Sequence, residues 1–257
     1  MSDQPTRSLF GESEFANQEQ EKPMGMMDII SGIFSDPVEL FRRLSKKPQW
    51  AGAMVLGAVA IVVFMVAWSL RVDALEFVFA QIERAMPNSP RLQQLTSDQL
   101  EQSATIQARL TPFIYPVSGM INSVIFSFFF GLLYWAVSLF SKEDLQWKPT
   151  YKHGLVVACV PDLITVPYCF LGTIMAFLNP VGTFMHTQIV PSSLAYWLET
   201  DSPRLLTLYG LVDLFLLAQY VMIFFAAKYT LRTKTWGATI CVALALLIPG
   251  LSVWMAK

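Results

Sequence analysis

Residues 50–70 read WAGAMVLGAVAIVVFMVAWSL, a stretch in which no side chain is charged. A helix of this length, rising about 1.5 Å per residue, reaches roughly 30 Å, which is the thickness of the hydrocarbon core of a bilayer. The chain contains five such apolar runs, at about residues 49–70, 112–140, 154–178, 205–227 and 235–256. They predict an all-α, polytopic membrane protein with five transmembrane helices, in which residues 49–256 form the membrane domain.

The composition of the whole chain supports this class. Of the 257 residues, 54% are hydrophobic and 14% are charged, whereas about a quarter of a soluble domain is charged. The formal net charge of −1 gives no basic field, and we therefore expect no nucleic acid as a partner. Cys159, Cys169 and Cys241 lie in apolar runs without the spacing of a zinc site, and His153 and His186 are expected on opposite sides of the membrane. We therefore expect no metal and no cofactor.

The segment before the first span has two parts. Residues 1–23 are polar and acidic without periodicity, and we expect them to form a disordered cytoplasmic tail. Residues 24–48 have the apolar spacing of two amphipathic helices, the second of which begins at Asp36 as its N-cap. We expect both helices to lie on the membrane surface, where a basic cluster on the second helix meets anionic lipids. This membrane-surface basic cluster consists of Arg42, Arg43, Lys46 and Lys47.

The basic residues that flank the spans predict the orientation, because cytoplasmic loops are enriched in lysine and arginine. With the N-terminus in the cytoplasm, ten of these residues lie inside and six lie outside. The inner residues are Arg42, Arg43, Lys46, Lys47, Lys142, Lys148, Lys152, Lys228, Arg232 and Lys234. The outer residues are Arg71, Arg84, Arg91, Arg109, Arg204 and Lys257. The bias predicts a cytoplasmic N-terminus and an external C-terminus.

Two polar segments are expected outside the membrane. The longer one is a helical excursion over residues 71–111, with one helix close to the membrane and a second at about 97–110 that begins with Thr96 and Gln99, spaced as a capping box. The other contains VPSSLAYWLE (190–199), which is typical of a short capped helix with aromatic residues for the interface. Neither segment resembles a catalytic domain.

Small side chains form a ridge along one face of the second span, because they recur every fourth residue. The ridge consists of Gly119, Ser123, Ser127 and Gly131. Small residues let two helix backbones approach closely. Two interpretations are open, packing within the same bundle and a homo-oligomer interface, and the need to pack five spans with short loops favours the first.

The third and fourth spans each contain one acid, and a charged carboxylate at the centre of a span costs roughly 2.5 to 3.5 kcal/mol. Asp162 lies between Pro161 and Pro167, which are expected to bend the helix and free backbone carbonyls. Each acid is expected about 13 Å deep, from opposite sides, so that the two meet near the midplane and share a proton. Two phenols on the helix face of Asp213 are expected as its donors, those of Tyr209 and Tyr220.

Three interpretations compete for this intramembrane polar pair. An intramembrane aspartyl protease is disfavoured, because the residues before Asp213 read GLVD (210–213) and not GxGD. A transporter needs buried acids and broken helices, both of which are expected, although five spans show no inverted repeat. A neutral, hydrogen-bonded structural pair that fixes the helix register is the interpretation that we favour at this point.

Three stretches of the chain combine aromatic with hydrophobic residues, and the first two also contain proline: FSDPVELFRRLSKKPQW (34–50), DLQWKPTYKHGLVVACVP (144–161) and LYGLVDLFLLAQYVM (208–222). Their order along residues 30–255 resembles the Yip family (Ypt-interacting proteins, with the "Yip-one" domain), and especially its bacterial branch. The resemblance implies a non-enzymatic protein of the bacterial cytoplasmic (inner) membrane. Eukaryotic members bind Rab-type GTPases and act in vesicle traffic, but their acidic-aromatic DLYGP-type stretch does not occur here, so GTPase binding is assigned to no residue.

The sequence therefore leaves two functions to compare. The expected one is an integral membrane scaffold or adaptor of Yip type, non-enzymatic and linked to membrane organisation or trafficking. Its expected partners are the lipid bilayer and a membrane or cytoplasmic protein, with a second copy of the chain as a further partner. The alternative is a small proton- or cation-coupled transporter that uses Asp162 and Asp213. The sequence contains no HExxH, phosphate-binding glycine loop or Ser-His-Asp arrangement on which an enzyme could rest.

Overall fold

The computed structural model describes residues 23–86, 89–178, 181–182, 185–198, 200 and 202–255. Over these ranges the regular elements are helices, and the described residues form no β-strand. A few pairs of residues form isolated β-bridges. The all-α fold class expected from the sequence is therefore confirmed. The expected cytoplasmic tail, apart from Pro23, lies outside the described residues.

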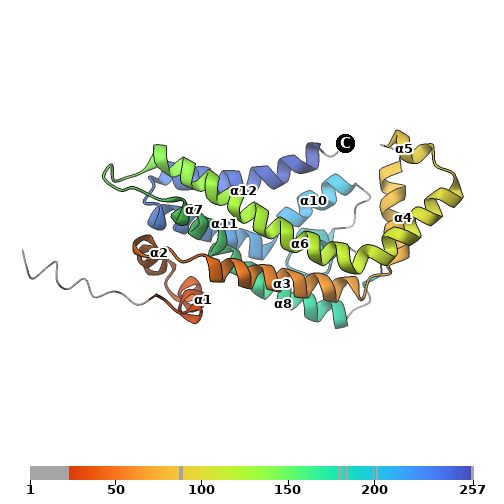
Figure 1. Ribbon diagram of the computed structural model, residues 1–257, viewed down its shortest axis with the longest axis horizontal. Coiled ribbons are helices and arrows are strands. Elements are labelled where there is room, and N and C mark those ends of the chain that lie inside the picture. Colours follow the sequence, from red (N-terminus) through yellow and green to blue (C-terminus); the bar gives the residue numbers. More distant parts are fainter. Residues whose placement is uncertain are drawn as a thin grey trace, which may run out of the picture.

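The long helices run side by side along one bundle (Figure 1). In chain order they are α3 (Ala51–Ser69), α6 (Ser97–Ser141), α7 (Tyr151–Cys159) with the 3-10 turn η2 (Pro161–Ile164) and α8 (Thr165–Leu178), α10 (Pro203–Leu211) with α11 (Leu214–Thr230), and α12 (Thr235–Met255). At one end Lys234 donates its backbone N–H to the Ser141 carbonyl over 2.7 Å, and at the other Asp73 donates to Gly182 over 2.9 Å. Within the described ranges the chain thus runs the length of the bundle five times.

Among the described residues, three helical segments are long and apolar enough to cross a membrane. They are Ala51–Ser69, Ser97–Ser141 and Tyr151–Leu178, in which α7 and α8 are joined through η2. The fourth and fifth predicted spans correspond to shorter apolar helices, Leu214–Thr230 and Thr235–Leu251. The fourth is shorter because the expected helix over 205–227 is interrupted at Val212 and Asp213, where α10 ends and α11 begins. Length and composition therefore support three of the five predicted spans.

Helix α6 joins two elements that the sequence predicted as separate. The capping box is confirmed, because Thr96 accepts from the Gln99 N–H and Gln99 accepts from the Thr96 N–H. The expected break between the helix at 97–110 and the second span does not occur, although Pro112 and Pro116 lie inside α6. Each proline removes one backbone hydrogen bond, which bends a long helix without ending it when the neighbouring turns hold. Figure 1 shows the bend.

Outside the bundle, α4 (Ala74–Ala85) and α5 (Pro90–Gln93) extend from the end opposite to α1 and α2 (Figure 1). Asp73 caps α4 by accepting from the Glu76 N–H over 3.1 Å. Phe77 and Val78 of α4 are buried, and this helix packs on the first turns of α6. The short helix expected in 190–199 is α9 (Leu194–Trp197).

The N-terminal helices α1 (Met26–Ser35) and α2 (Pro37–Lys46) lie within the predicted segment 24–48, and Asp36 caps α2 through the Glu39 N–H over 3.0 Å. The sequence predicted that the apolar face of α2 lies on lipid, and this prediction is wrong. Phe41 and Leu44 are 0% exposed because they pack in the same core cluster as residues of α7 and α11. Two hydrogen bonds fix α2 on the bundle, from the Thr230 hydroxyl to the Phe41 carbonyl and between His153 Nε2 and the Ser45 carbonyl. Protein therefore covers the apolar face of α2, whereas Phe34 of α1 remains 68% exposed.

The small-residue ridge of α6 faces into the bundle. A Cβ added at Gly131 would collide with Leu155 of α7, and one at Gly119 would come within 3.1 Å of Ile61 of α3. Ser127 is buried, and Ser123 is partly buried. The ridge therefore packs against helices of the same chain, as the first of the two interpretations predicted.

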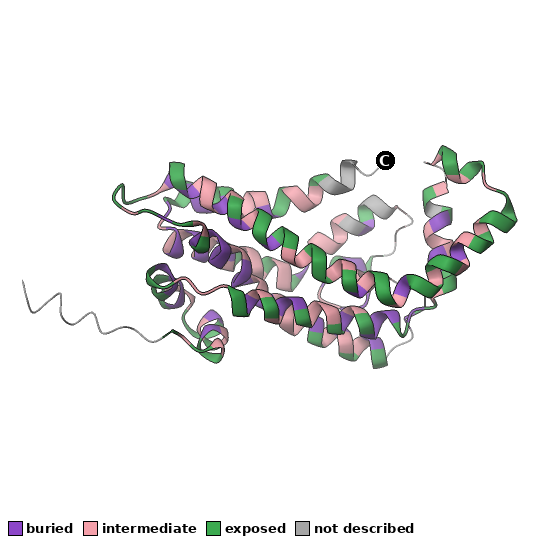
Figure 2. Cartoon of the chain, in the orientation of Figure 1, coloured by how far each residue is buried: buried purple, intermediate pink, exposed green. Residues whose placement is uncertain are grey.

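The outer faces of the long helices are apolar. Val59 and Val63 of α3 are about half exposed, at 53% and 52%, and Phe113 and Val117 of α6 at 69% and 51%. Figure 2 shows exposed positions along both helices. A large apolar face without a protein partner among the described residues is typical of a membrane protein, because lipid covers it.

Candidate functional site

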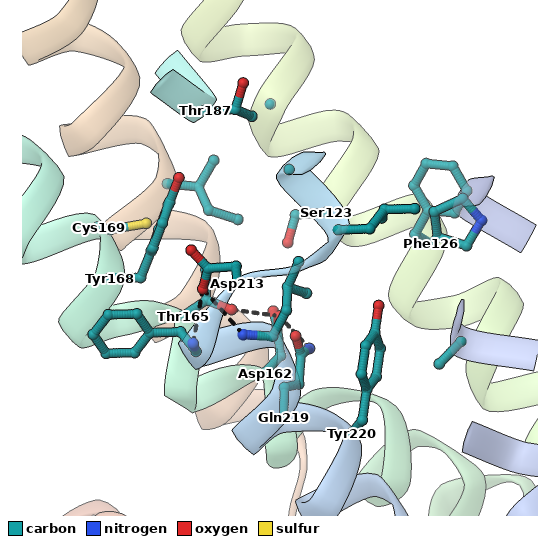
Figure 3. A pocket seen from close by; sticks show the side chains of 18 of the residues that line it. Ser123, Phe126, Asp162, Thr165, Tyr168, Cys169, Thr187, Asp213, Gln219 and Tyr220 are labelled. Atoms are coloured by element: carbon teal, nitrogen blue, oxygen red, sulfur yellow. Dashed lines mark hydrogen bonds between the residues drawn. The ribbon is translucent and has the colours of Figure 1, made fainter. Parts of the chain in front are cut away.

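The described residues enclose a cavity of about 510 Å³ within the bundle. Helices α3, α6, α8, α11 and α12 contribute to its walls, and the loop between α8 and α10 closes one end. Most of the lining is apolar or aromatic, but both predicted acids, Asp162 and Asp213, lie in it (Figure 3). No lysine or arginine is among the described lining residues. A cavity of this size and polarity can hold a small molecule or a cluster of water.

Asp162 lies in η2, where the third span changes from α-helix to 3-10 turn. Pro161 has no N–H to continue α7, so the helix ends and the Asp162 side chain turns into the cavity. Its Oδ1 accepts from the Thr165 hydroxyl and from the Gln219 amide, each over 3.1 Å. Its Oδ2 lies over Gly57 of α3, where an added Cβ would come within 3.2 Å. One oxygen is thus doubly hydrogen-bonded, and the other has no donor among the described residues.

Asp213 lies at the break between α10 and α11 and is the N-cap of α11. Its Oδ1 accepts from the backbone N–H groups of Phe215 and Leu216 over 2.7 and 3.2 Å, and its Oδ2 accepts from the Ser192 hydroxyl. The side chain is only 3% exposed. Backbone donors at a helix N-terminus stabilise a negative charge. The donor set of Asp213 therefore suits an ionised carboxylate.

The expected tyrosine partners of Asp213 are replaced by this cap. Among the described residues neither Tyr209 nor Tyr220 donates a hydrogen bond to it. Tyr220 lines the cavity, but Tyr209 does not. The expectation failed because it assumed a continuous helix through Asp213, whereas the side chain of an N-cap residue turns back to its own helix.

The two acids share the cavity without forming the expected hydrogen-bonded pair. Each carboxyl group has its own donors, and no hydrogen bond joins them in the part of the chain that the structure describes. Asp162 has two side-chain donors on one oxygen, whereas Asp213 has donors on both. The two acids therefore differ in what they can bind. The Asp162 oxygen without a donor is free to bind a proton or a cation, whereas both oxygens of Asp213 already accept hydrogen bonds.

The loop between α8 and α10 closes the cavity beside Asp213. Leu194 donates its N–H to the Val212 carbonyl over 3.0 Å, and Leu214 donates to the Ser192 carbonyl over 3.1 Å. His186 lies in the turn η3 (His186–Gln188) and contacts the rings of Phe64 and Trp68, whose centroids are 6.4 and 5.8 Å away. Burial lowers the pKa of His186 to about 4, and its Nδ1 has no hydrogen-bond partner among the described residues. The cavity therefore has a neutral imidazole at this end.

Sequence reasoning missed several residues of this site. Gln219 is an amide within an apolar run, and that exception to the pattern was a usable signal. Ser192 carried no comparable signal, because a serine in a polar loop is ordinary and its bond to Asp213 depends on a contact 21 residues away. The sequence placed His186 and His153 on opposite sides of the membrane. In the structure they lie at opposite ends of the bundle, His186 beside Trp68 and His153 beside Ser45.

No group of three His, Cys, Asp or Glu side chains suited to a metal occurs within the described ranges. The cysteines Cys159, Cys169 and Cys241 are buried and unpaired with one another. No family model matches the sequence, and no curated protein or solved structure is similar to it. The site is therefore interpreted from its own geometry.

Proposed function

We propose that the chain is a small proton-coupled transporter in which Asp162 binds and releases the coupling proton within the cavity. One observation carries this proposal: the cavity of about 510 Å³ contains both acids, and each acid lies where a long helix is broken. Broken helices beside acids near the middle of the membrane are typical of secondary transporters. The proposal includes five membrane crossings, with the N-terminus in the cytoplasm of a bacterium.

The two acids have different roles in this proposal. Asp213 is the fixed cap of α11, because two backbone N–H groups and Ser192 donate to it. Asp162 alternates between the acid and the carboxylate, since one oxygen is held by Thr165 and Gln219 while the other is available. A fixed negative charge in the same apolar cavity favours the entry of a proton or of a cationic substrate.

Proton flux into vesicles tests the proposal directly. Purified protein is reconstituted into proteoliposomes with a trapped pH indicator, and a pH gradient is imposed with valinomycin and potassium present. The wild type is expected to carry a saturable proton flux, and Asp162→Asn is expected to abolish it because an amide cannot cycle a proton. Asp213→Asn is expected to retain a reduced flux, since asparagine also caps helices.

The controls separate transport from misfolding. Asp162→Asn keeps an acceptor for Thr165 and Gln219, so its unfolding transition in detergent is expected to match that of the wild type. Equal flux in wild type and Asp162→Asn would overturn the proposal. The absence of flux in every variant would favour the structural role of the two acids that the sequence first suggested.

A scaffold or adaptor of Yip type is the second proposed function. It is supported by the order of the parts, in which α1 and α2 pack beside the start of the bundle and leave Arg42 and Arg43 exposed on the predicted cytoplasmic side. Crosslinking in the native membrane, followed by mass spectrometry, tests this function. A single partner that is lost when Arg42 and Arg43 are replaced by glutamine would support it.

A further inference from the structure

A second cavity, which we call the basic groove, opens at the end of the bundle where α2 is docked. It has a volume of about 440 Å³ and is formed by α2, by the loop between α6 and α7, and by the end of α11 with the turn that follows. The loop and the turn are joined, because Glu143 donates its N–H to the Arg232 carbonyl over 2.8 Å. Three segments distant in sequence thus form one groove.

The groove carries a net positive charge. Its cations are Arg42, Lys46, Lys228 and Arg232, and its carboxylates are Glu143 and Asp144. Lys228 Nζ lies 3.2 Å from Glu143 Oε2, so one cation and one carboxylate neutralise each other. Four cations against two carboxylates leave a net charge of +2, which suits an anionic ligand that also bears hydrogen-bond donors.

Aromatic rings hold both arginines of the groove. The guanidinium carbon of Arg42 lies 5.3 Å from the centroid of the Tyr229 ring, and that of Arg232 lies 4.0 Å from the Trp147 ring. A ring face attracts a guanidinium and restricts the positions that it samples, while its N–H groups can still donate to a phosphate. The rings therefore keep both arginines beside the groove.

The surroundings of the basic groove favour a phospholipid as the molecule that supplies the anionic group. Exposed apolar side chains lie at the same end of the bundle, with Phe140 of α6 at 84% and Trp236 of α12 at 49% exposure. Ser141, the neighbour of Phe140, and Lys234, two residues before Trp236, are joined by a backbone hydrogen bond, so the apolar surface and the basic loop are close. A phospholipid presents a phosphate and an acyl chain together, whereas a free phosphate or a phosphopeptide presents no chain.

We propose that the basic groove is a specific site for the headgroup of an anionic phospholipid with a hydroxylated headgroup, such as phosphatidylglycerol. The phosphate binds at Arg42 and Arg232, and the headgroup hydroxyls donate to the carboxylates of Glu143 and Asp144. The site differs from diffuse attraction by the basic cluster of α2, because only two of its four members, Arg42 and Lys46, line the groove. It does not depend on the transport function of the other cavity.

Matched variants of the full-length protein test the site. The double variant Arg42→Gln/Lys46→Gln and the double variant Arg43→Gln/Lys47→Gln remove the same charge from the same helix, but only the first pair lines the groove. Delipidated protein in neutral detergent is titrated with phosphatidylglycerol, and bound lipid is counted by native mass spectrometry. We expect the first variant to lose about tenfold or more in affinity, which is about 1.4 kcal/mol or more, and the second to stay within about twofold.

Two further arms complete the test. Tyr229→Leu keeps the charge and removes one stacking ring, and it is expected to weaken lipid binding even if the first double variant folds poorly. Inorganic phosphate and phosphatidylcholine are used as competitors, and neither is expected to displace phosphatidylglycerol. Equal losses in the two double variants would show diffuse surface attraction and overturn the proposal, and displacement by inorganic phosphate would overturn a lipid as the ligand.

Discussion

At the scale of single residues, Asp162 shows how a polar group is held within an apolar bundle. Thr165 and Gln219 both donate to its Oδ1. Asp162→Leu leaves both donors without an acceptor and is expected to cost about 1–3 kcal/mol of the free energy of unfolding, whereas Asp162→Asn keeps the acceptor and is expected to be nearly neutral. Denaturant unfolding in detergent measures both. If asparagine destabilises as much as leucine, the charge of Asp162 contributes more than its hydrogen bonds.

His186 gives a pH dependence whose sign follows from its burial. Burial lowers its pKa to about 4 from the ordinary value of 6.5, so between these values the unfolded chain binds a proton that the folded chain does not. The contribution of His186 to stability is therefore present above pH 6.5 and is lost as the pH falls toward 4. Stability measured between pH 7 and 4 should fall more steeply for the wild type than for His186→Gln. Parallel curves would contradict the burial of the imidazole.

The sequence predicted part of this detail and missed the rest for a physical reason. Thr165 follows Asp162 by three residues, a spacing at which side chains on one helical turn can meet. Gln219 lies 57 residues from Asp162, so its donation depends on how α11 packs on η2. The sequence also did not predict that Asp213 is an N-cap. The stretch LVDLF (211–215) is as apolar as the interior of a continuous helix.

At the scale of elements, α6 and α7 pack closely because glycine lies at their contact, at Gly131 of the small-residue ridge and at Gly154. A Cβ at Gly154 would overlap the Gly131 carbonyl oxygen, so Gly154→Ala must push the helices apart and is expected to cost about 1–3 kcal/mol. Gly210→Ala is the matched control, since the nearest atom would lie 3.9 Å away, at Thr187. Thermal unfolding in detergent compares the two. A neutral Gly154→Ala would contradict the close approach.

The sequence predicted the helical elements better than their breaks and their partners. Local signals such as Asp36 before Pro37, and Thr96 with Gln99, fixed where α2 and α6 begin. The apolar face of α2 was also clear, but periodicity alone does not show whether lipid or protein covers a face. That choice depends on contacts such as Thr230 with Phe41, which are 189 residues apart.

At the scale of the whole molecule, the five passes along the bundle determine where each loop lies. Ser141 and Lys234 are joined at one end, whereas Asp73 and Gly182 are joined at the other. The five apolar runs predicted helices joined by loops at alternate ends, whereas the orientation predicted from lysine and arginine stays a prediction. Among the described residues, length and composition distinguish three helices as sufficient to cross a membrane, so the number of crossings needs a direct measurement.

The side of the membrane on which residue 234 lies is the most direct test of the proposed five crossings, which would place the cavity within the membrane. Single cysteines are introduced at residues 88, 146 and 234 after Cys159, Cys169 and Cys241 are replaced by alanine. A maleimide that cannot cross the membrane is applied to intact cells, and then again after permeabilisation.

With five crossings and a cytoplasmic N-terminus, residue 88 should react from outside, whereas residues 146 and 234 should react only after permeabilisation. If only the three long helices cross, the whole chain after Leu178 lies outside and residue 234 reacts in intact cells. Labelling of residue 234 from outside, with residue 146 protected, would contradict the account.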